Sequence, residues 1–205
     1  MEDVIRLENI RMNLGSKLIF HDLSFDFKKR IYVIKGESGI GKTTLLNLLS
    51  GYMPCPDGKV IVAGGKRVSY LFQENLLFHN LTVRENLYIK FHALYEDDSQ
   101  FEDIMRDVVH KLQIESLIEK RVNLLSGGEK QRVQLAILSL DNAEIFLMDE
   151  PISNVDEENA EKIISYVESI ALDKLIIIVS HQPINMHVKY QLLQLKEGKL
   201  YEVER

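Results

Sequence analysis

The apolar residues of this chain change their spacing along its length. In the first 35 residues they alternate with polar ones, as at Leu23, Phe25 and Phe27, which predicts antiparallel strands. Later runs of strand length are apolar at nearly every position, as is typical of strands buried on both faces of a parallel sheet. These runs lie at residues 30–34, 144–150 and 175–179.

Helical spacing marks other parts of the chain. Residues 43–49 predict a helix, and from Leu81 onward the period is helical, with Thr82 and Glu85 spaced as a capping box. A helical stripe follows, made of Phe101, Ile104, Met105, Val108, Val109 and Leu112. Residues 58–65 resemble a hairpin arm, and 197–199 a hairpin turn. The mixture predicts an α/β fold.

A glycine-rich segment lies between the first buried strand and the helix at 43–49. Residues 36–43, Gly-Glu-Ser-Gly-Ile-Gly-Lys-Thr, fit the pattern of a phosphate-binding loop, G-x-x-x-x-G-K-[ST]. Its backbone N–H groups and the start of the following helix attract phosphates, Lys42 adds a positive charge, and the Thr43 hydroxyl can ligate Mg²⁺. An accidental glycine-rich turn is the alternative, but the strand-loop-helix order favours a nucleoside triphosphate site.

Two adjacent carboxylates end the strand-like run at 144–150. Asp149 and Glu150 would lie at the carboxyl edge of a parallel strand, where ligands bind in open α/β sheets. Side chains alternate along a strand, so one carboxylate can serve Mg²⁺ while the other polarises an attacking water. For such a pair on its own, a solvated acidic turn is the simpler interpretation.

Composition narrows the function classes. The chain has 205 residues, 45% of them hydrophobic and 27% charged, with a formal net charge of −6 and a single cysteine, Cys55. This charge offers no basic footprint for nucleic acid, and no internal disulfide can form. No apolar run approaches the length of about 18 residues that spans a membrane, and residues 1–3 do not begin a signal peptide. We therefore expect a cytoplasmic protein unless a partner tethers it.

Further motifs make the chain resemble the ATP-binding cassette (ABC) nucleotide-binding domains. Residues 36–43 match the Walker A loop of that family and residues 145–150 match Walker B with its catalytic glutamate, while residues 125–132, Leu-Ser-Gly-Gly-Glu-Lys-Gln-Arg, match the family signature. Residues 70–73 resemble its Q-loop, 153–156 its D-loop, and 180–181 its histidine switch. The resemblance implies one ABC domain over residues 1–205: a P-loop NTPase with a mainly parallel core sheet, an N-terminal antiparallel β-subdomain and a helical subdomain inserted at about 80–125.

The resemblance also implies roles for particular residues. Glu150 would be the general base, with Lys42, Gln73 and His181 as the other catalytic residues. ATP would be held by Gly36, Glu37, Ser38, Gly39, Ile40, Gly41, Lys42, Thr43 and Thr44. Mg²⁺ would be held by Thr43, Gln73 and Asp149. The residues Ser126, Gly127, Gly128 and Glu129 would contact a triphosphate held by a second cassette, so that two ATP molecules lie between two subunits. As residues alone, Ser126 and Glu129 predict a capping box at a helix start, which is compatible with that role.

The expected partners are a second cassette, identical or different, and an integral membrane permease, with no nucleic acid. That places the chain at the inner face of the cell membrane, where the apolar residues Leu76, Leu77 and Phe78 are expected to line the groove that receives the permease. Residues 72–86 resemble the lipoprotein-release, macrolide and antimicrobial-peptide export cassettes, which favours export. A stand-alone ABC ATPase of DNA repair or translation is the alternative. A metabolic kinase would leave the signature and His181 unexplained.

One departure from the family concerns the nucleobase. The family stacks an aromatic ring on adenine near the start of the chain, and the aligned position falls on Leu14 or Asn13. Neither side chain has a ring, so selection of ATP over GTP is expected to be relaxed.

Overall fold

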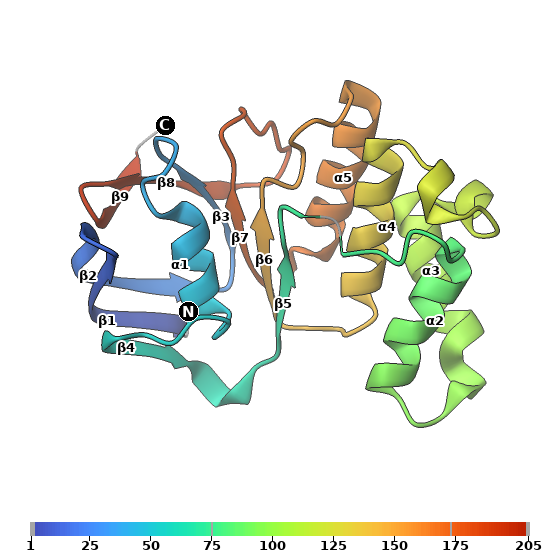
Figure 1. Cartoon of the computed structure of the whole chain (residues 1–205), viewed down its shortest axis with the longest axis horizontal. Coiled ribbons are helices and arrows are strands. Elements are labelled where there is room, and N and C mark those ends of the chain that lie inside the picture. The colour runs from blue at the N-terminus through green and yellow to red at the C-terminus, as the bar shows by residue number, and fades with distance from the viewer. Residues whose placement is uncertain (1–2, 75, 173, 204–205) are drawn as a thin grey trace.

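Two sheets organise the molecule (Figure 1). The computed structural model describes residues 3–74, 76–172 and 174–203. A three-stranded antiparallel sheet has the order β2-β1-β4, formed by β1 (Asp3–Leu14), β2 (Lys17–Lys28) and β4 (Asp57–Val62). The alternation in the first 35 residues thus forms the predicted antiparallel pair.

The larger sheet has six strands in the order β5-β6-β7-β3-β8-β9. The first five run parallel, and β9 pairs antiparallel with β8 through the predicted turn. The predicted buried runs become its central strands β3 (Ile31–Lys35), β6 (Ile145–Asp149) and β7 (Leu175–Val179), which are buried almost throughout. The remaining strands are β5 (Val68–Leu71), β8 (Tyr190–Lys196) and β9 (Lys199–Val203).

Helices cover the two faces of this sheet differently. On one face lies α1 (Lys42–Leu49), with the small sheet beyond it; on the other lie α4 (Gly127–Ser139) and α5 (Glu157–Ile170). Two further helices, α2 (Val83–Leu94) and α3 (Phe101–Leu112), pack against α4, and α3 also touches α5. Short 3-10 turns at 63–65, 98–100, 115–117 and 122–124 complete the helical segments.

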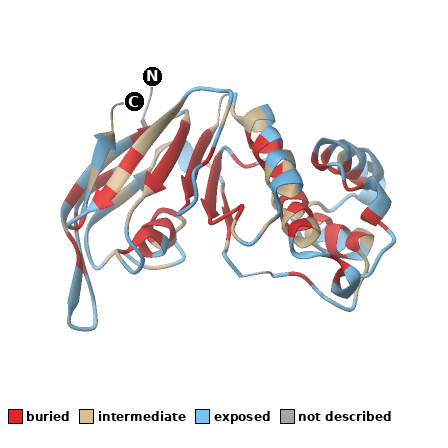
Figure 2. Cartoon of the chain, turned by 90° about the horizontal axis from the view of Figure 1, so that it is seen from above, coloured by how far each residue is buried: buried red, intermediate tan, exposed pale blue. Residues whose placement is uncertain are grey.

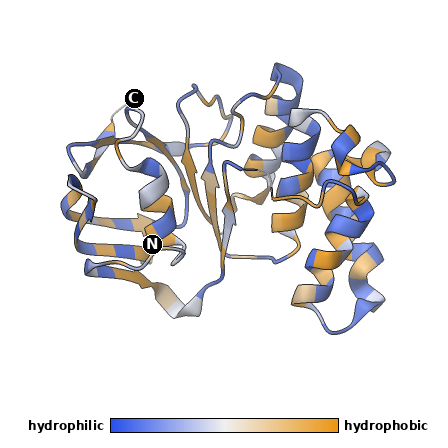
Figure 3. Cartoon of the chain, in the orientation of Figure 1, coloured by the Kyte–Doolittle hydropathy of each residue, from blue (hydrophilic) through white to orange (hydrophobic). Residues whose placement is uncertain are grey.

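The central strands serve two separate hydrophobic cores. Successive residues of β6 alternate between them: Phe146 and Met148 pack with α2–α5, whereas Ile145 and Leu147 pack with α1 and the small sheet. The ribbon of these central strands is accordingly coloured mostly as buried (Figure 2), and β6 and β7 are coloured mostly as hydrophobic (Figure 3). The stripe at 101–112 faces the first core, as its spacing predicts.

The expectation of a hairpin arm at 58–65 is wrong. Its strand, β4, pairs with β1 in the register Ile5↔Val62, and the chain then leaves for the other sheet instead of folding back on itself. Gly58 has φ 92°, and a Cβ there would lie 2.5 Å from the carbonyl oxygen of Glu8. The glycine therefore permits the close approach of β1, a pairing between segments about 50 residues apart that local pattern does not reveal.

Within the described part of the chain, no helix combines the length and the apolar character needed to cross a membrane.

Candidate functional site

The phosphate-binding loop connects β3 to α1 in the predicted order. Gly39 and Gly41 have φ values of 70° and 112°, which side chains with a Cβ rarely adopt. A Cβ on Gly41 would lie 2.4 Å from Cγ2 of Ile19, and one on Gly36 would lie 2.8 Å from the carbonyl oxygen of Leu195. The loop is thus held closely between β2 and β8.

Two lysines donate hydrogen bonds to carbonyl groups of this loop. Lys42, only 5% exposed, contacts the oxygens of Gly36 and Glu37 through its Nζ at 2.9 and 2.8 Å. Burial lowers the pKa of Lys42, and the negative charges of Glu150 and Asp149 oppose that shift. The second lysine, Lys17 on β2, donates to the oxygen of Gly39 at 2.8 Å. Its position in a solvated hairpin gives no local signal for that contact.

Asp149 ends β6 as the sequence predicts. It is 1% exposed, and the Thr43 hydroxyl at the start of α1 forms a hydrogen bond with it. Burial raises the pKa of the Asp149 carboxyl above its usual value, while Thr43, Lys42 and His181 oppose the shift. Its Oδ2 is buried and has no hydrogen-bond partner within residues 3–74, 76–172 and 174–203.

That arrangement fits a magnesium ion. An acceptor oxygen without a partner lies beside a threonine hydroxyl, and oxygen ligands are those that Mg²⁺ prefers. Among the residues that the structure describes, no three His, Cys, Asp or Glu side chains gather as a metal-binding cluster. A metal here would take its remaining ligands from phosphate oxygens and water, as Mg²⁺ usually does in nucleotide sites.

Glu150 leaves the strand in a left-handed backbone conformation, with φ 53°. Its carboxylate is 7% exposed and accepts hydrogen bonds from the backbone N–H of His181, at 3.0 and 3.2 Å to its two oxygens. The imidazole Nε2 of His181 lies 3.4 Å from Oε1 of Glu150. The ends of β6 and β7 thus bring together two residues that are 31 positions apart.

One cavity of about 420 Å³ collects most of the predicted site residues. Its lining combines the phosphate loop, both carboxylates, the histidine and Gln73, together with Leu14, one of the two residues expected at the nucleobase position. The predicted residues in its wall are Ser38, Gly39, Gly41, Lys42, Thr43, Thr44, Gln73, Asp149, Glu150 and His181. Sequence reasoning missed Ile19, Val179 and Gln182 in the same wall, because nothing in their local pattern is unusual.

Other predicted residues lie apart from this cavity. Glu37 and Ile40 line a neighbouring hollow of about 290 Å³, which Ser38 joins to the first. Residues 126–129 line neither hollow; they begin α4, where Ser126 and Glu129 form the predicted capping box. A single chain therefore does not bring its signature residues to its own phosphate loop.

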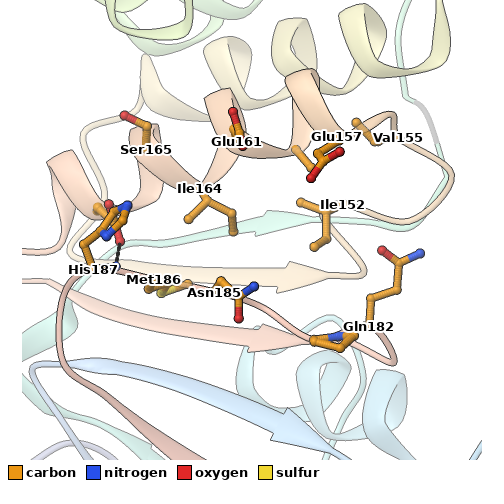
Figure 4. A pocket seen from close by; sticks show the side chains of 13 residues that line it. Ile152, Val155, Glu157, Glu161, Ile164, Ser165, Gln182, Asn185, Met186 and His187 are labelled. Carbon is orange, nitrogen blue, oxygen red and sulfur yellow. Dashed lines mark hydrogen bonds between the residues drawn. The ribbon is translucent and has the colours of Figure 1, made fainter.

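A larger hollow, of about 820 Å³, lies elsewhere (Figure 4). It runs between α5 and residues 182–187, and Ile152 and Ile164 form part of its apolar wall. Of the cavity residues named above, it shares only Gln182. We assign the chemistry to the smaller cavity, because that one holds the carboxylates, the histidine and the phosphate loop.

The expected docking residues divide. Leu76 and Phe78 are 65% and 58% exposed, whereas Leu77 is 6% exposed and belongs to the core around α2 and α3. Leu76 and Leu77 border a hollow of about 280 Å³ between β5 and α4. Of the three residues expected to line the docking groove, two are therefore exposed and one is buried. Asn75, within the export-like segment, and Met1 and Glu2 lie outside the described residues.

Comparison with known proteins relates this geometry to a family. A family model described as ABC transporter matches residues 20–153. A probable ABC transporter ATP-binding/permease protein of Haemophilus influenzae is 32% identical over 98% of the chain, and the chain spans 40% of its length. The thiamine import ATP-binding protein ThiQ of the same species is 30% identical, over 98% of this chain and 99% of that one. Another relative, ABC transporter G family member 20 of Dictyostelium discoideum, is 30% identical, and 29% of its length is covered.

Solved structures agree on the fold. An ATP-binding cassette determined as a dimer in a post-hydrolysis state with ADP and phosphate superposes with a TM-score of 0.85, at 22% identity and over 98% of both chains. The cassette cbiO1 of Clostridium perfringens gives 0.84 at 20% identity, covering 98% of this chain and 88% of that one. The predicted cassette fold is confirmed.

Proposed function

The chain belongs to the ABC transporter family of ATP-binding ATPase domains, and from that premise we propose that it is the subunit that powers a membrane transporter through ATP hydrolysis. The observation that carries the proposal is the convergence of the phosphate loop, Asp149, Glu150 and His181 on one cavity. Because the chain covers under half of its longer relatives, the transported substrate and the identity of the permease are left to experiment.

The side chains of the cavity divide the work of phosphoryl transfer to water. We assign Lys42 to the β and γ phosphates. When they are bound, its ammonium group would contact phosphate oxygens in place of the carbonyl oxygens of Gly36 and Glu37. Glu150 is the general base: the backbone N–H of His181, shared between both carboxylate oxygens, orients its carboxylate at the cavity wall. The imidazole of His181, and Gln73 from the segment after β5, are assigned to the γ-phosphate and the attacking water.

Thr43, Asp149 and Gln73 are the proposed holders of Mg²⁺. When bound, the ion supplies positive charge that offsets the charge on the phosphates. The orphaned Oδ2 of Asp149 and the adjacent Thr43 hydroxyl support the assignment. Leu14 offers the nucleobase an aliphatic contact in place of a ring, so we propose that discrimination between ATP and GTP is weak.

We further propose that hydrolysis requires two cassettes. Residues 126–129 form a helix start led by Gly127 and Gly128, and the backbone N–H groups at a helix start suit an anion. These residues line no part of the chain's own phosphate cavity. A second copy, or a related cassette, would bring its triphosphate to this helix start.

The variant Glu150→Gln tests both the base and the shared site. Loss of the base should stop turnover while leaving ATP binding intact, so an ATP-dependent dimer should accumulate that the wild type forms only transiently. Size-exclusion chromatography with light scattering, at saturating ATP and Mg²⁺, measures it. Lys42→Ala is the matched control, because it should lose ATP binding and remain monomeric. A Glu150→Gln protein that binds ATP yet stays monomeric would refute the shared site.

Contact with the permease is proposed at the exposed apolar pair Leu76 and Phe78. In ABC transporters the ATP-binding domains work with membrane permease subunits, and this pair lies three and five positions after Gln73 of the cavity. Replacing Leu76 and Phe78 with Glu should lower transport by reconstituted transporter at least about tenfold, with ATP affinity unchanged, since each removes an exposed apolar contact. Leu77→Glu is the contrasting variant, because a charge there would enter the core and lower stability. Loss of ATP binding by the Leu76 and Phe78 variants would refute the assignment.

Export is the direction that we propose, on the resemblance of residues 72–86. ThiQ, an importer by name, is a relative over the whole chain, so the direction needs its own experiment. Uptake of substrate into inside-out vesicles carrying the complete transporter supports export, whereas uptake into right-side-out vesicles supports import.

A further inference from the structure

Asn159, in the first turn of α5, lies where three segments meet. Its backbone N–H donates to Oδ1 of Asp156 at 3.0 Å, and its side-chain Nδ2 donates to Oδ2 of the same carboxylate at 2.7 Å. Its Oδ1 accepts a hydrogen bond from Nε of Arg132, on α4, at 2.8 Å. One amide therefore binds an anion with its donor and a cation with its acceptor, which Asp, Ser or Ala cannot do together at this position.

The glycines at the start of α4 press against the same segment. A Cβ on Gly128 would lie 2.7 Å from Cβ and Cγ of Asn159, closer than side chains tolerate. A Cβ on Gly127 would lie 3.7 Å from the carbonyl oxygen of Asn154. The start of α4, which we propose to contact the nucleotide of a second cassette, thus packs against residues 154–159 of its own chain.

Arg132 extends the junction to α3. The guanidinium is 5% exposed, and its NH1 donates to the carbonyl oxygens of Leu112 and Gln113, where α3 ends. Burial lowers the pKa of Arg132, and of the acidic groups that oppose this shift Glu129 has the largest effect. A buried guanidinium that loses Asn159 would leave its Nε unpaired, which is costly.

The other end of the segment reaches the catalytic cavity. Ser153 and Asn154 line that cavity together with Glu150 and His181, and the Ser153 hydroxyl donates to the carbonyl oxygen of Glu150 at 3.0 Å. A continuous set of contacts therefore runs from the chain's own cavity, through residues 153–156 and Asn159, to the start of α4.

We propose that Asn159 is a positioning residue that holds the start of α4 in the orientation needed to contact the nucleotide of a second cassette. This rests on the shared site proposed above. Asn159 touches no nucleotide itself; it sets the place of Gly127 and Gly128 through Arg132 and through direct packing. Its loss should weaken dimerisation and turnover while leaving ATP binding by the monomer intact.

The experiment introduces Asn159→Ala and the isosteric Asn159→Asp, each with and without Glu150→Gln. Asn159→Asp keeps the acceptor for Arg132 but puts a carboxylate beside Asp156 in place of the amide donor. Ser165→Ala, on an exposed turn of the same helix, is the control. A fluorescent ATP analogue measures monomer affinity, light scattering measures the ATP-dependent dimer, and phosphate release gives kcat.

We expect monomer affinity within about twofold of the parent, and dimer affinity and kcat lower by about tenfold or more, the scale of one lost charge-assisted hydrogen bond. A cycle with Arg132→Gln adds a second readout: if the two residues act as one unit, the double variant loses little more kcat than the single ones. Additive losses, unchanged dimerisation of both Asn159 variants, or losses that merely follow monomer affinity or thermal stability would overturn the inference. A Glu150→Gln parent that does not dimerise refutes the shared site itself and removes the basis of this inference.

Discussion

At the scale of single residues, Asp149 shows a cost that the site imposes on the fold. Its carboxyl is buried at 1% exposure, and one of its oxygens has no hydrogen-bond partner in the described part of the chain. Ionisation in that setting is unfavourable, and burial accordingly raises its pKa above 3.8. A group with a raised folded pKa supports stability below the unfolded pKa and loses that support as pH rises through the folded one.

Asp149→Asn should therefore stabilise the nucleotide-free protein near neutral pH, because asparagine keeps the shape without the buried charge. The gain should vanish as the pH falls to about 3.8 and below, where Asp149 is protonated in both states. Thermal midpoints between pH 3 and 7 measure it, at about 2–4 °C for each kcal/mol gained. Asp103→Asn, an exposed residue of α3, should show no such trend. An equal or lower midpoint for Asp149→Asn at pH 7 contradicts the argument.

Some residues of the candidate site could be predicted from the sequence and others could not. Asp149, Glu150 and His181 were found because each ends an apolar run, and parallel strands place such ends at one edge. Asn159 and Lys17 were missed because each is an ordinary polar residue of its own element. Their contacts, with Arg132 and Gly39, join parts of the chain 27 and 22 positions apart.

At the scale of elements, two helices begin with the same device. Thr82 and Glu85 form a capping box on α2, and Ser126 and Glu129 form one on α4. Both boxes were predictable, since capping depends on residues three positions apart. The pairing of β4 with β1 was not, because sheet register depends on distant segments.

Comparison of the two caps separates structure from function. Ser126→Ala and Thr82→Ala should each cost about 1 kcal/mol of stability, the usual value of an N-cap side chain. Only Ser126→Ala should also weaken the ATP-dependent dimer, because α4 is the helix proposed to face the second nucleotide. Thermal unfolding and light scattering in the Glu150→Gln background measure the two effects. Equal dimerisation by both variants would assign Ser126 to capping alone.

At the scale of the whole molecule, the six-stranded sheet lies between two hydrophobic cores, one on each of its faces. Heat should unfold both in one step, because losing either core exposes a face of β3, β6 and β7. Differential scanning calorimetry checks this: the calorimetric and van't Hoff enthalpies should agree, and two resolved peaks would contradict it. The sequence predicted the sheet and the helical segment but not which helices cover which face, since that depends on how distant elements pack.

Side chains alternate along β6, so its odd-numbered and even-numbered positions pack into different cores. A smaller side chain at Leu147 would loosen the packing beneath the phosphate loop, whereas one at Met148 would loosen the bed of the helix carrying Gly127 and Gly128. Substitutions at adjacent residues of one strand are thus expected to affect different sites. The one at Leu147 would disturb binding of the chain's own nucleotide, and the one at Met148 would disturb the helix start proposed to contact the nucleotide of a second cassette.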